Sequence, residues 1–285
     1  MIDERGLIPT VGEYLDSLEA RRPAKIVQSS AHMIRDGEVK LIKHYFLPSE
    51  YPTIEILQIT DTQIGHYAFK EDRFLEYRKW ILSRPNRFIV LTGDIVDAAT
   101  PLSVQSPYEN KWEPSVQIQH AVDLLVPMSH RILGSVGGNH ERRTGKTFGD
   151  AGALIAQLLK IQYSRGKQLI DIHYGDHDPF KISIWHGFGT ARTKGARLNV
   201  VHRFMQEGDS QLYLVGHLHD VVATYDWRQY REGGHVKLQK IAGVMSSSFL
   251  DYWNTFAEIA GLAASDTMMA RVILEPDGHW EITLK

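Results

Sequence analysis

The sequence predicts a layered α/β fold in which two β-sheets pack together and helices lie outside them. Between residues 54 and 140, apolar runs of strand length alternate with amphipathic helical segments, which is typical of a mainly parallel sheet. After residue 165 the pattern changes to a succession of strands that one helix interrupts. No repeat or linker separates these regions, so we expect one large domain preceded by an N-terminal extension.

The extension, residues 1–50, is expected to pack on the core. Helical apolar spacing and two short apolar runs predict one helix and two strands, over residues 10–22, 24–30 and 38–47. Pro48 and Pro52 then interrupt the chain, and we place the main domain at residues 51–285.

The strands of the first region are mainly apolar and are interpreted as buried strands. Its expected elements are strands at 54–60, 87–94 and 131–140 and helices at 71–84 and 116–128. A polar stretch with prolines, residues 98–114, follows the second strand. In the second region we expect strands at 168–174, 180–187, 211–219, 235–244, 268–276 and 279–285, and a helix at 198–206.

Composition narrows the classes of function. The chain has 285 residues, of which 43% are hydrophobic and 23% charged, an ordinary globular mixture. It contains no cysteine, which excludes disulfides and thiolate metal sites, and its net charge of -2 provides no overall basic field for nucleic acid. No apolar run is long enough to span a membrane, and the first ten residues lack an apolar signal core. We therefore expect no membrane association and a cytoplasmic location.

Five short motifs stand where predicted strands end, and each offers side chains that can bind a cation. They are residues 61–63 (DTQ), 93–97 (GDIVD), 138–141 (GNHE), 185–187 (WHG) and 216–219 (GHLH). Any one of them alone is also typical of a turn or of a packed histidine. Their joint occurrence at strand ends, where α/β sheets gather their sites, indicates a metal centre. Carboxylate, amide and imidazole groups without thiolates suit Mn²⁺, Fe, Zn²⁺ or Mg²⁺.

These five motifs, in this order, resemble the calcineurin-like metallophosphoesterase superfamily over residues 54 to about 245. The resemblance implies a four-layer α/β/β/α sandwich with two mixed β-sheets and a centre of two divalent metal ions, for which we expect Mn²⁺. It further implies that Asp94 bridges the two ions. The remaining ligands would divide into two sets: Asp61, residue 63 and His219 for one ion, and Asn139, His186 and His217 for the other.

Position 63 departs from the family pattern, which has histidine there, because this chain has Gln63. Three arrangements remain open: Gln63 binds the ion through its amide oxygen, it holds a water on the ion, or the ion binds loosely. His66, three residues further on, is either a substitute ligand or a loop residue near the substrate. A neutral oxygen ligand shifts the expected metal toward Mn²⁺ or Mg²⁺.

The resemblance also implies a catalytic pair, His140 and Asp97. His140 would donate a proton to the leaving oxygen, and Asp97 would fix it and favour its charged form. Glu141 is expected to support the site or to begin a helix. Hydroxide shared by the two ions would attack the phosphorus in line, with no covalent enzyme intermediate.

Basic residues that follow two of the motifs, Arg142, Arg143 and Arg192, are the candidate substrate-binding residues. They suggest a polyanionic substrate, so we expect a phosphodiesterase that acts on nucleic acid or a nucleotide. A phosphomonoesterase or protein phosphatase is the alternative within the same chemistry. A non-catalytic interaction module, favoured by Gln63, and a protein that uses its ions only for stability are the alternatives outside it.

Three further segments complete the sequence-based expectations. The aromatic residues Tyr67, Trp112, Tyr252 and Trp253 could stack on bases, but packing in the core or in an interface is the simpler interpretation. The apolar segment 246–265 is expected either to cap the core or to join two copies of the chain. Residues 173–178 and 277–279 are rich in histidine and aspartate but are interpreted as turns without a site.

Overall fold

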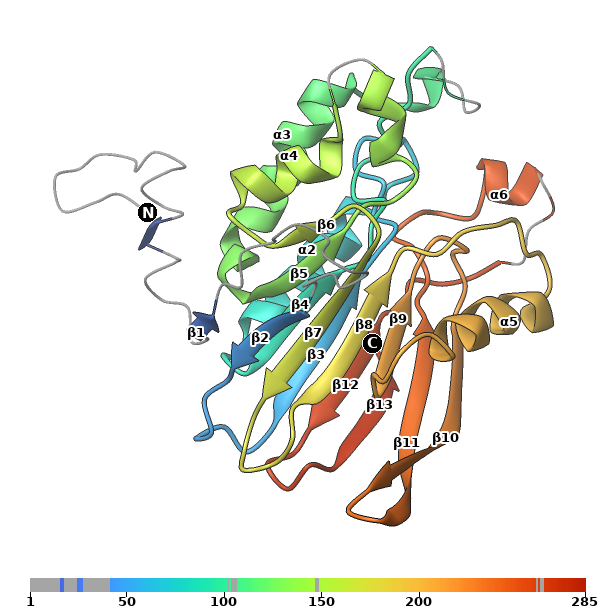
Figure 1. The fold of residues 1–285 in the computed structure, drawn as a ribbon. Coiled ribbons are helices and arrows are strands. Elements are labelled where there is room, and N and C mark those ends of the chain that lie inside the picture. Colours follow the sequence, from blue (N-terminus) through green and yellow to red (C-terminus); the bar gives the residue numbers. More distant parts are fainter. Residues whose placement is uncertain are drawn as a thin grey trace, which may run out of the picture.

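The structure, a computed structural model, describes residues 16–17, 25–27, 42–101, 103, 107–146, 149–259, 261 and 264–285. Its strands form two mixed sheets (Figure 1). In the six-stranded sheet the order is β13-β12-β3-β4-β5-β6, with β3 to β6 parallel and β12 and β13 antiparallel. Its strands are β3 (Ile54–Ile59), β4 (Arg87–Leu91), β5 (Ile132–Val136), β6 (Tyr163–Ser164), β12 (Ala270–Leu274) and β13 (Trp280–Leu284).

The seven-stranded sheet has the order β1-β2-β7-β8-β9-β11-β10. β8 and β9 are parallel and form its centre, and the long antiparallel hairpin of β10 and β11 forms one edge and extends beyond the other strands (Figure 1). The strands are β1 (Lys25–Val27), β2 (Ile42–Phe46), β7 (Lys167–His173), β8 (Phe180–Trp185), β9 (Leu212–Val215), β10 (Val222–Glu232) and β11 (His235–Met245).

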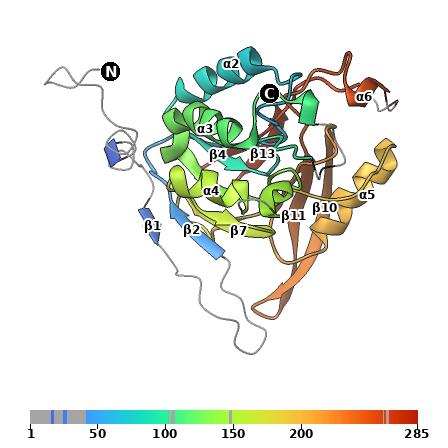
Figure 2. The same ribbon diagram turned by 90° about the horizontal axis from the view of Figure 1, so that it is seen from above.

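Helices flank the two sheets on opposite sides (Figure 2). Apolar side chains of α2 (Glu71–Leu82), α3 (Pro114–Leu125) and α4 (Ala151–Leu158) pack on the six-stranded sheet. Those of α5 (Lys194–Met205) pack on β9, β10 and β11. The remaining helical segments are η1 (Pro107–Glu109), η2 (Val126–Arg131), η3 (Glu141–Lys146) and α6 (Phe256–Ile259). The α/β/β/α sandwich with two mixed sheets is therefore confirmed.

β3 is buried along its whole length because a layer covers each of its two faces. Ile54 and Ile56 face the other sheet and join a core with Ile170 and Ile182, whereas Leu57 lies in the core beneath the helices. A strand with one layer on each face is buried at every position, and the two polar side chains of β3, Glu55 and Gln58, are hydrogen-bonded. Burial of both faces fixes the register of the central strands, and thereby fixes where each of them ends.

Among the elements that the sequence pattern did not predict are β10 and α4. β10 is half exposed and carries charged and aromatic residues in alternation, so it lacks an apolar run. α4 is short and contains glycine and alanines, and Asp150 caps it by accepting hydrogen bonds from the N–H groups of Gly152 and Ala153.

Most of the predicted extension lies outside the described residues. Within it, β2 pairs in parallel with β7, and β1 pairs with β2, so these segments belong to the edge of the seven-stranded sheet. The boundary at residue 50 stays a prediction. Across the part of the chain that the structure describes, no helix is long and apolar enough to cross a membrane.

Candidate metal centre

The predicted ligands come together at one edge of the sandwich, in the loops that follow β3, β4, β5, β8 and β9. Backbone hydrogen bonds tie these loops together: Asp61 N–H donates to Gly93 O (3.0 Å), and Gly216 N–H donates to His186 O (3.1 Å). The side chain of Gln58 connects the two sheets just below, because its Nε2 donates to Thr92 Oγ1 (2.7 Å) and to Val215 O (2.8 Å).

The backbone at the site is held in an uncommon conformation. Of the eight non-glycine residues with positive φ in the described part of the chain, five belong to the predicted metal centre: Asp61, Gln63, Asp94, His217 and His219. Such conformations cost free energy for residues with a Cβ and are concentrated at functional sites. His217 and His219 therefore lie in a loop after β9, not on the extended strand that the sequence suggested.

Two glycines allow the ligand loops to approach closely. A Cβ added to Gly138 would lie 2.0 Å from Asp94 Oδ1, and one added to Gly216 would lie 2.1 Å from Thr60 Oγ1 and 2.7 Å from Asp61 Oδ2. All three distances are far inside van der Waals contact, so glycine is the residue that fits at both positions.

The first ligand set is Asp94, Asn139, His186 and His217. The Nε2 atom of His186 lies 3.0 Å from Asn139 Oδ1 and 3.2 Å from Asp94 Oδ2, while its Nδ1 donates to Thr92 O (2.8 Å). Ligand atoms of Asp94, His186 and His217 lie within 4.8 Å of one another. Burial opposes charge on His186, but the Asp94 carboxylate outweighs it and raises the pKa of His186 to about 9.

His217 completes this set and supports its interpretation as a cation site. Its Nε2 donates to Gly189 O (2.8 Å), whereas its Nδ1 is buried and has no hydrogen-bond partner among the described residues. A buried nitrogen without a partner is costly, and a cation held with Asp94 and His186 would satisfy it. The residues present therefore fit a divalent ion with imidazole, carboxylate and amide ligands.

The second set is Asp61, Gln63 and His219. Asp61 is fully buried; its Oδ1 lies 3.1 Å from His219 Nε2, and its Oδ2 accepts hydrogen bonds from His217 N–H (2.9 Å) and Thr60 Oγ1 (2.6 Å). Burial opposes the charge of Asp61, but His219 outweighs it, so its pKa is lowered. Gln63 is 4% exposed, and its Nε2 lies 3.2 Å from His219 Nε2.

His140 and Asp97 form the predicted pair beside the centre. Nδ1 of His140 lies 2.8 Å from Asp97 Oδ1, and its Nε2 lies 3.5 Å from Asp94 Oδ2. Burial favours the neutral imidazole, but the carboxylates of Asp94 and Asp97 outweigh it and raise the pKa of His140. The guanidinium of Arg143, whose Nη2 is 2.9 Å from His140 Nε2, acts in the opposite direction.

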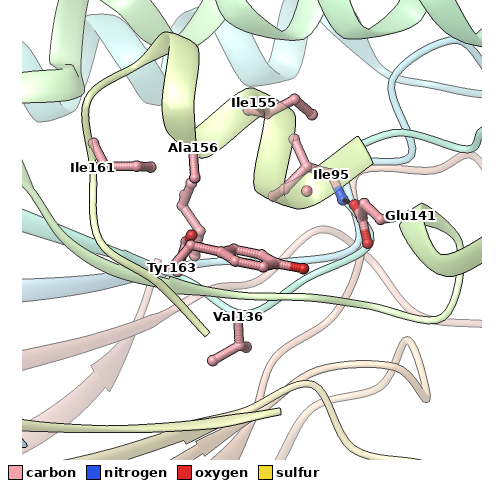
Figure 3. A pocket seen from close by; sticks show the side chains of 10 residues that line it. Ile95, Val136, Glu141, Ile155, Ala156, Ile161 and Tyr163 are labelled. Atoms are coloured by element: carbon pink, nitrogen blue, oxygen red, sulfur yellow. Dashed lines mark hydrogen bonds between the residues drawn. The ribbon is translucent and has the colours of Figure 1, made fainter. Parts of the chain in front are cut away.

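Glu141 has a more specific role than the sequence indicated. Its buried carboxylate accepts hydrogen bonds from the N–H groups of Asp94 (3.1 Å), Ile95, Val96 (3.3 Å) and Gly138 (2.9 Å). Figure 3 shows this carboxylate against Ile95 at the end of a small apolar cavity, with its hydrogen bond to the Ile95 N–H drawn. Glu141 thus fixes the loop that presents Asp94. Burial and the nearby Asp94 raise its pKa to about 7.

The candidate substrate-binding arginines differ in their surroundings. Arg143 lies against His140, whereas Arg142 is exposed and its Nε donates to Gly138 O (2.8 Å). Arg192 is exposed in the loop between β8 and α5. Arg197, a neighbouring basic residue, forms a buried ion pair with Asp220 and is not available to a substrate.

Exposed aromatic side chains surround the ligand loops. Tyr67 stacks on His66 (ring centroids 4.6 Å apart) and is 42% exposed, and Trp253 is 69% exposed. Phe188, which the sequence analysis missed, is 62% exposed and follows His186 by two residues. Its position directly after the WHG motif was the available signal.

Three other residues from the sequence analysis lie in different surroundings. His66 accepts a hydrogen bond at Nδ1 from Ala68 N–H (3.1 Å) and is 4% exposed, so it stays a candidate for contact near the substrate. Phe249, in the segment 246–265, packs against Phe74 and caps the core. His173 contacts His44 (3.2 Å between Nδ1 of His44 and Nε2 of His173), away from the metal centre.

Comparison with known proteins agrees with the motifs. The sequence model of the family described as calcineurin-like phosphoesterase matches residues 54–221, which is more than half of the chain. No curated protein matches it.

Several solved structures resemble the chain at low identity. A protein serine/threonine phosphatase from Saccharomyces cerevisiae shares 12% identity, with 99% of this chain and 91% of that chain covered and a TM-score of 0.39. A nuclease from Pseudomonas putida shares 13% identity over 80% of this chain and 87% of that chain, with a TM-score of 0.35. An NAD nucleotidase from Haemophilus influenzae shares 11% identity over 81% of this chain, with a TM-score of 0.35. The chain spans about half of that nucleotidase's length (49%), and none of these likenesses decides a substrate.

Proposed function

The chain belongs to the calcineurin-like phosphoesterase family, and from this we propose that it is a metal-dependent phosphoesterase that prefers phosphodiesters. The observation that supports catalysis best is the His140–Asp97 pair, which lies beside Asp94 of the ligand cluster. A proton donor next to a cation site is the arrangement that phosphoester hydrolysis needs.

Two divalent ions at this site would activate a water molecule and neutralise charge on the phosphate. Asp94 would lie between them, with Asn139, His186 and His217 on one side and Asp61, Gln63 and His219 on the other. We propose Mn²⁺ as the metal, because the centre mixes imidazoles with several oxygen ligands and the chain has no thiolate.

The chain's own residues would handle the proton and the substrate charge. Asp97 holds His140 by Nδ1, which leaves Nε2 to donate its proton to the oxygen that leaves the phosphorus. The leaving group then departs as an alcohol and His140 becomes neutral. Arg143 can only donate to this nitrogen in the observed contact, so when Nε2 carries the proton the guanidinium would turn to bind a phosphate oxygen.

The preference for a diester rests on the surface around the centre. Arg142 and Arg192 are exposed beside the ligand loops, and Tyr67, Phe188 and Trp253 offer open aromatic faces. Cations and aromatic rings together suit a nucleotide or nucleic acid, whose phosphates and bases need both. A monoesterase or protein phosphatase is the alternative, since the same centre serves either substrate.

An interaction module without catalysis accounts less well for the structure. Such a module would have no use for a buried pair of His140 and Asp97 or for strained ligand loops. A protein that uses its ions only for stability is disfavoured for the same reason. A cytoplasmic location and association through residues 246–265 stay predictions.

The test is turnover of bis(p-nitrophenyl) phosphate and p-nitrophenyl phosphate by metal-free protein reconstituted with Mn²⁺. We expect faster turnover of the diester and none without metal. Turnover of the monoester alone would refute the diester preference, and failure on both, together with failure on an oligonucleotide, would refute the enzyme.

A further inference from the structure

We infer that Gln63 makes the two ion positions unequal, so that the position of Asn139, His186 and His217 fills first and that of Asp61, Gln63 and His219 fills second and more weakly. This inference rests on the proposed function only in its use of the two-ion centre. It concerns the residue at which this chain departs from its family.

The backbone around Gln63 holds this residue in a defined position within the site. Its backbone has φ 45°, its N–H donates to Asp94 O (2.9 Å), and its carbonyl accepts from His66 N–H (3.0 Å). Glutamine has no intrinsic preference for this left-handed conformation, so the surrounding loops impose it. The result is a buried side chain with a fixed origin and direction.

The side-chain amide of Gln63 lies between a ligand and the catalytic histidine. Its terminal nitrogen is 3.2 Å from His219 Nε2 and 3.5 Å from His140 Nε2. The amide oxygen and nitrogen are interchangeable by a half turn of the group. With a cation beside Asp61 and His219, the oxygen would turn toward the ion and the NH₂ group away from it.

The two positions then differ in their donors. Apart from the shared Asp94, the first position has two imidazoles and the amide oxygen of Asn139, and the second has one imidazole, one carboxylate and the amide oxygen of Gln63. Imidazole binds transition metals more strongly than a neutral amide oxygen, whereas oxygen ligands suit Mn²⁺ and Mg²⁺. Because Gln63 stands where the family pattern has a histidine, the second position lacks one imidazole, so it should bind its ion more weakly and should discriminate more strongly against Zn²⁺.

The two positions also differ in how well their ligands are oriented. His186 and His217 each donate from one ring nitrogen to a carbonyl, Thr92 O and Gly189 O, which directs the other nitrogen into the site. The side chain of His219 is 31% exposed, and its Nε2 faces Asp61 and Gln63. In the described part of the chain, a cluster of three His and Asp ligand atoms forms at the first position.

The experiment is a titration of metal-free protein with Mn²⁺. Calorimetry measures the binding events, and electron paramagnetic resonance shows whether the bound ions are isolated or paired. We expect two binding events whose affinities differ by about 10- to 100-fold. Mutation of a residue that supports a metal ligand typically lowers metal affinity by this factor. One equivalent should give the spectrum of an isolated ion, and a second should give a coupled pair. Two equal events in the wild type would overturn the inference.

Variants at position 63 separate the ligand role from a folding effect. Gln63→His should bring the two affinities together and let coupled pairs appear before one equivalent is reached. Gln63→Glu, which keeps the side-chain length and adds charge, should also strengthen the second event. Gln63→Ala should weaken the second event and leave the first unchanged. If His and Glu at this position both fold and both leave the two events unchanged, Gln63 does not set the difference.

His217→Ala is the matched control, because it should abolish the first event and not the second. The readout also separates this inference from the proposed function. Unequal binding without hydrolysis of any phosphoester would support the inference and refute the enzyme, and hydrolysis with equal sites would do the reverse.

Discussion

The two sheets contribute different chemistry to the metal centre. Loops after β3, β4 and β5 of the six-stranded sheet supply Asp61, Gln63, Asp94 and Asn139, whose ligand atoms are oxygens, and also His140. Loops after β8 and β9 of the seven-stranded sheet supply three imidazoles, His186, His217 and His219. Each proposed ion position would take ligands from both sheets, so the proposed centre would form only when the two sheets are packed in register. Formation of the site thus depends on the packing of the core between the two sheets.

The largest effect should come from His140, which lies on the six-stranded side. His140→Ala should reduce turnover by about 10²- to 10⁴-fold, the usual contribution of a general acid, and leave both Mn²⁺ binding events in place. Steady-state kinetics and calorimetry on the same preparation measure the two quantities. Loss of metal binding in this variant would mean that His140 is a ligand, and unchanged turnover would remove it from the mechanism.

The seven-stranded side should show its difference in the pH dependence of metal binding. The Asp94 carboxylate raises the pKa of His186 to about 9, whereas the pKa of Asp94 itself is lowered. At pH 7 the His186 imidazole must therefore lose a proton before it can bind the first ion. Affinity for the first ion should rise about tenfold per pH unit between pH 7 and 9 and level off above.

The stability of the metal-free protein should change with pH in the direction opposite to that of the metal affinity. A pKa raised in the folded state stabilises the metal-free protein fully below the unfolded value of about 6.5, and this stabilisation is lost as the pH rises through 9. Calorimetry in buffers of different ionisation enthalpy should show about one proton released at pH 7.5. No proton release would contradict the assignment of His186.

Substitution of Glu141 should show how far metal binding depends on the loop that carries Asp94. Glu141→Gln replaces an acceptor by an NH₂ group that faces N–H donors, so the loop of Asp94 should shift and the affinity of both ions should fall about 10- to 100-fold. Arg142→Ala, a change at the exposed neighbour, is the control and should leave both affinities unchanged. An effect confined to one ion would contradict the shared role of Asp94.

The junction between the sheets can be weakened at Gln58. Gln58→Ala removes the donor to Val215 O and leaves buried polar groups without partners, which should cost about 1–3 kcal/mol of unfolding free energy. Urea denaturation measures the loss. We also expect weaker metal binding, since the loops after β4 and β9 would no longer be held together; unchanged affinity would show that the loops position themselves.

The smallest change is expected at the rim. Arg192→Ala removes one exposed cation and should raise KM for a diester a few-fold without affecting kcat, as exposed charges contribute about 0.2–1 kcal/mol. The steady-state parameters at two salt concentrations decide this, because screening should reduce the difference. A fall in kcat with constant KM would place Arg192 among the catalytic groups.

The sequence predicted the sandwich and its ligand loops because both depend on local patterns. Mainly apolar runs with candidate ligands after their ends identify β3, β4 and β5, since burial on two faces leaves few polar positions within each strand. β10 escaped detection because it is half exposed, and its pairing with β11 is determined by the rest of the sheet.

Details of the site depended on contacts distant in sequence. Nothing near Glu141 in the chain shows that it binds the N–H groups of residues 94–96, and nothing near Arg197 shows its buried pair with Asp220. His217 lies with Asp94 and His186, whereas His219 lies beside Asp61, and the division of the two histidines between two ions stays a prediction. Left-handed backbone turns direct the two rings apart, not the alternation of a strand.

The most direct test of the two-ion centre is a crystal structure of the protein grown with Mn²⁺ and phosphate, with anomalous scattering measured at the manganese edge. We predict two peaks that share Asp94, one contacting Nδ1 of His217 and Nε2 of His186, the other contacting Asp61, His219 and the amide oxygen of Gln63. A phosphate oxygen should lie within hydrogen-bond reach of His140. A single peak at saturating Mn²⁺, or peaks away from Asp94, would contradict the account.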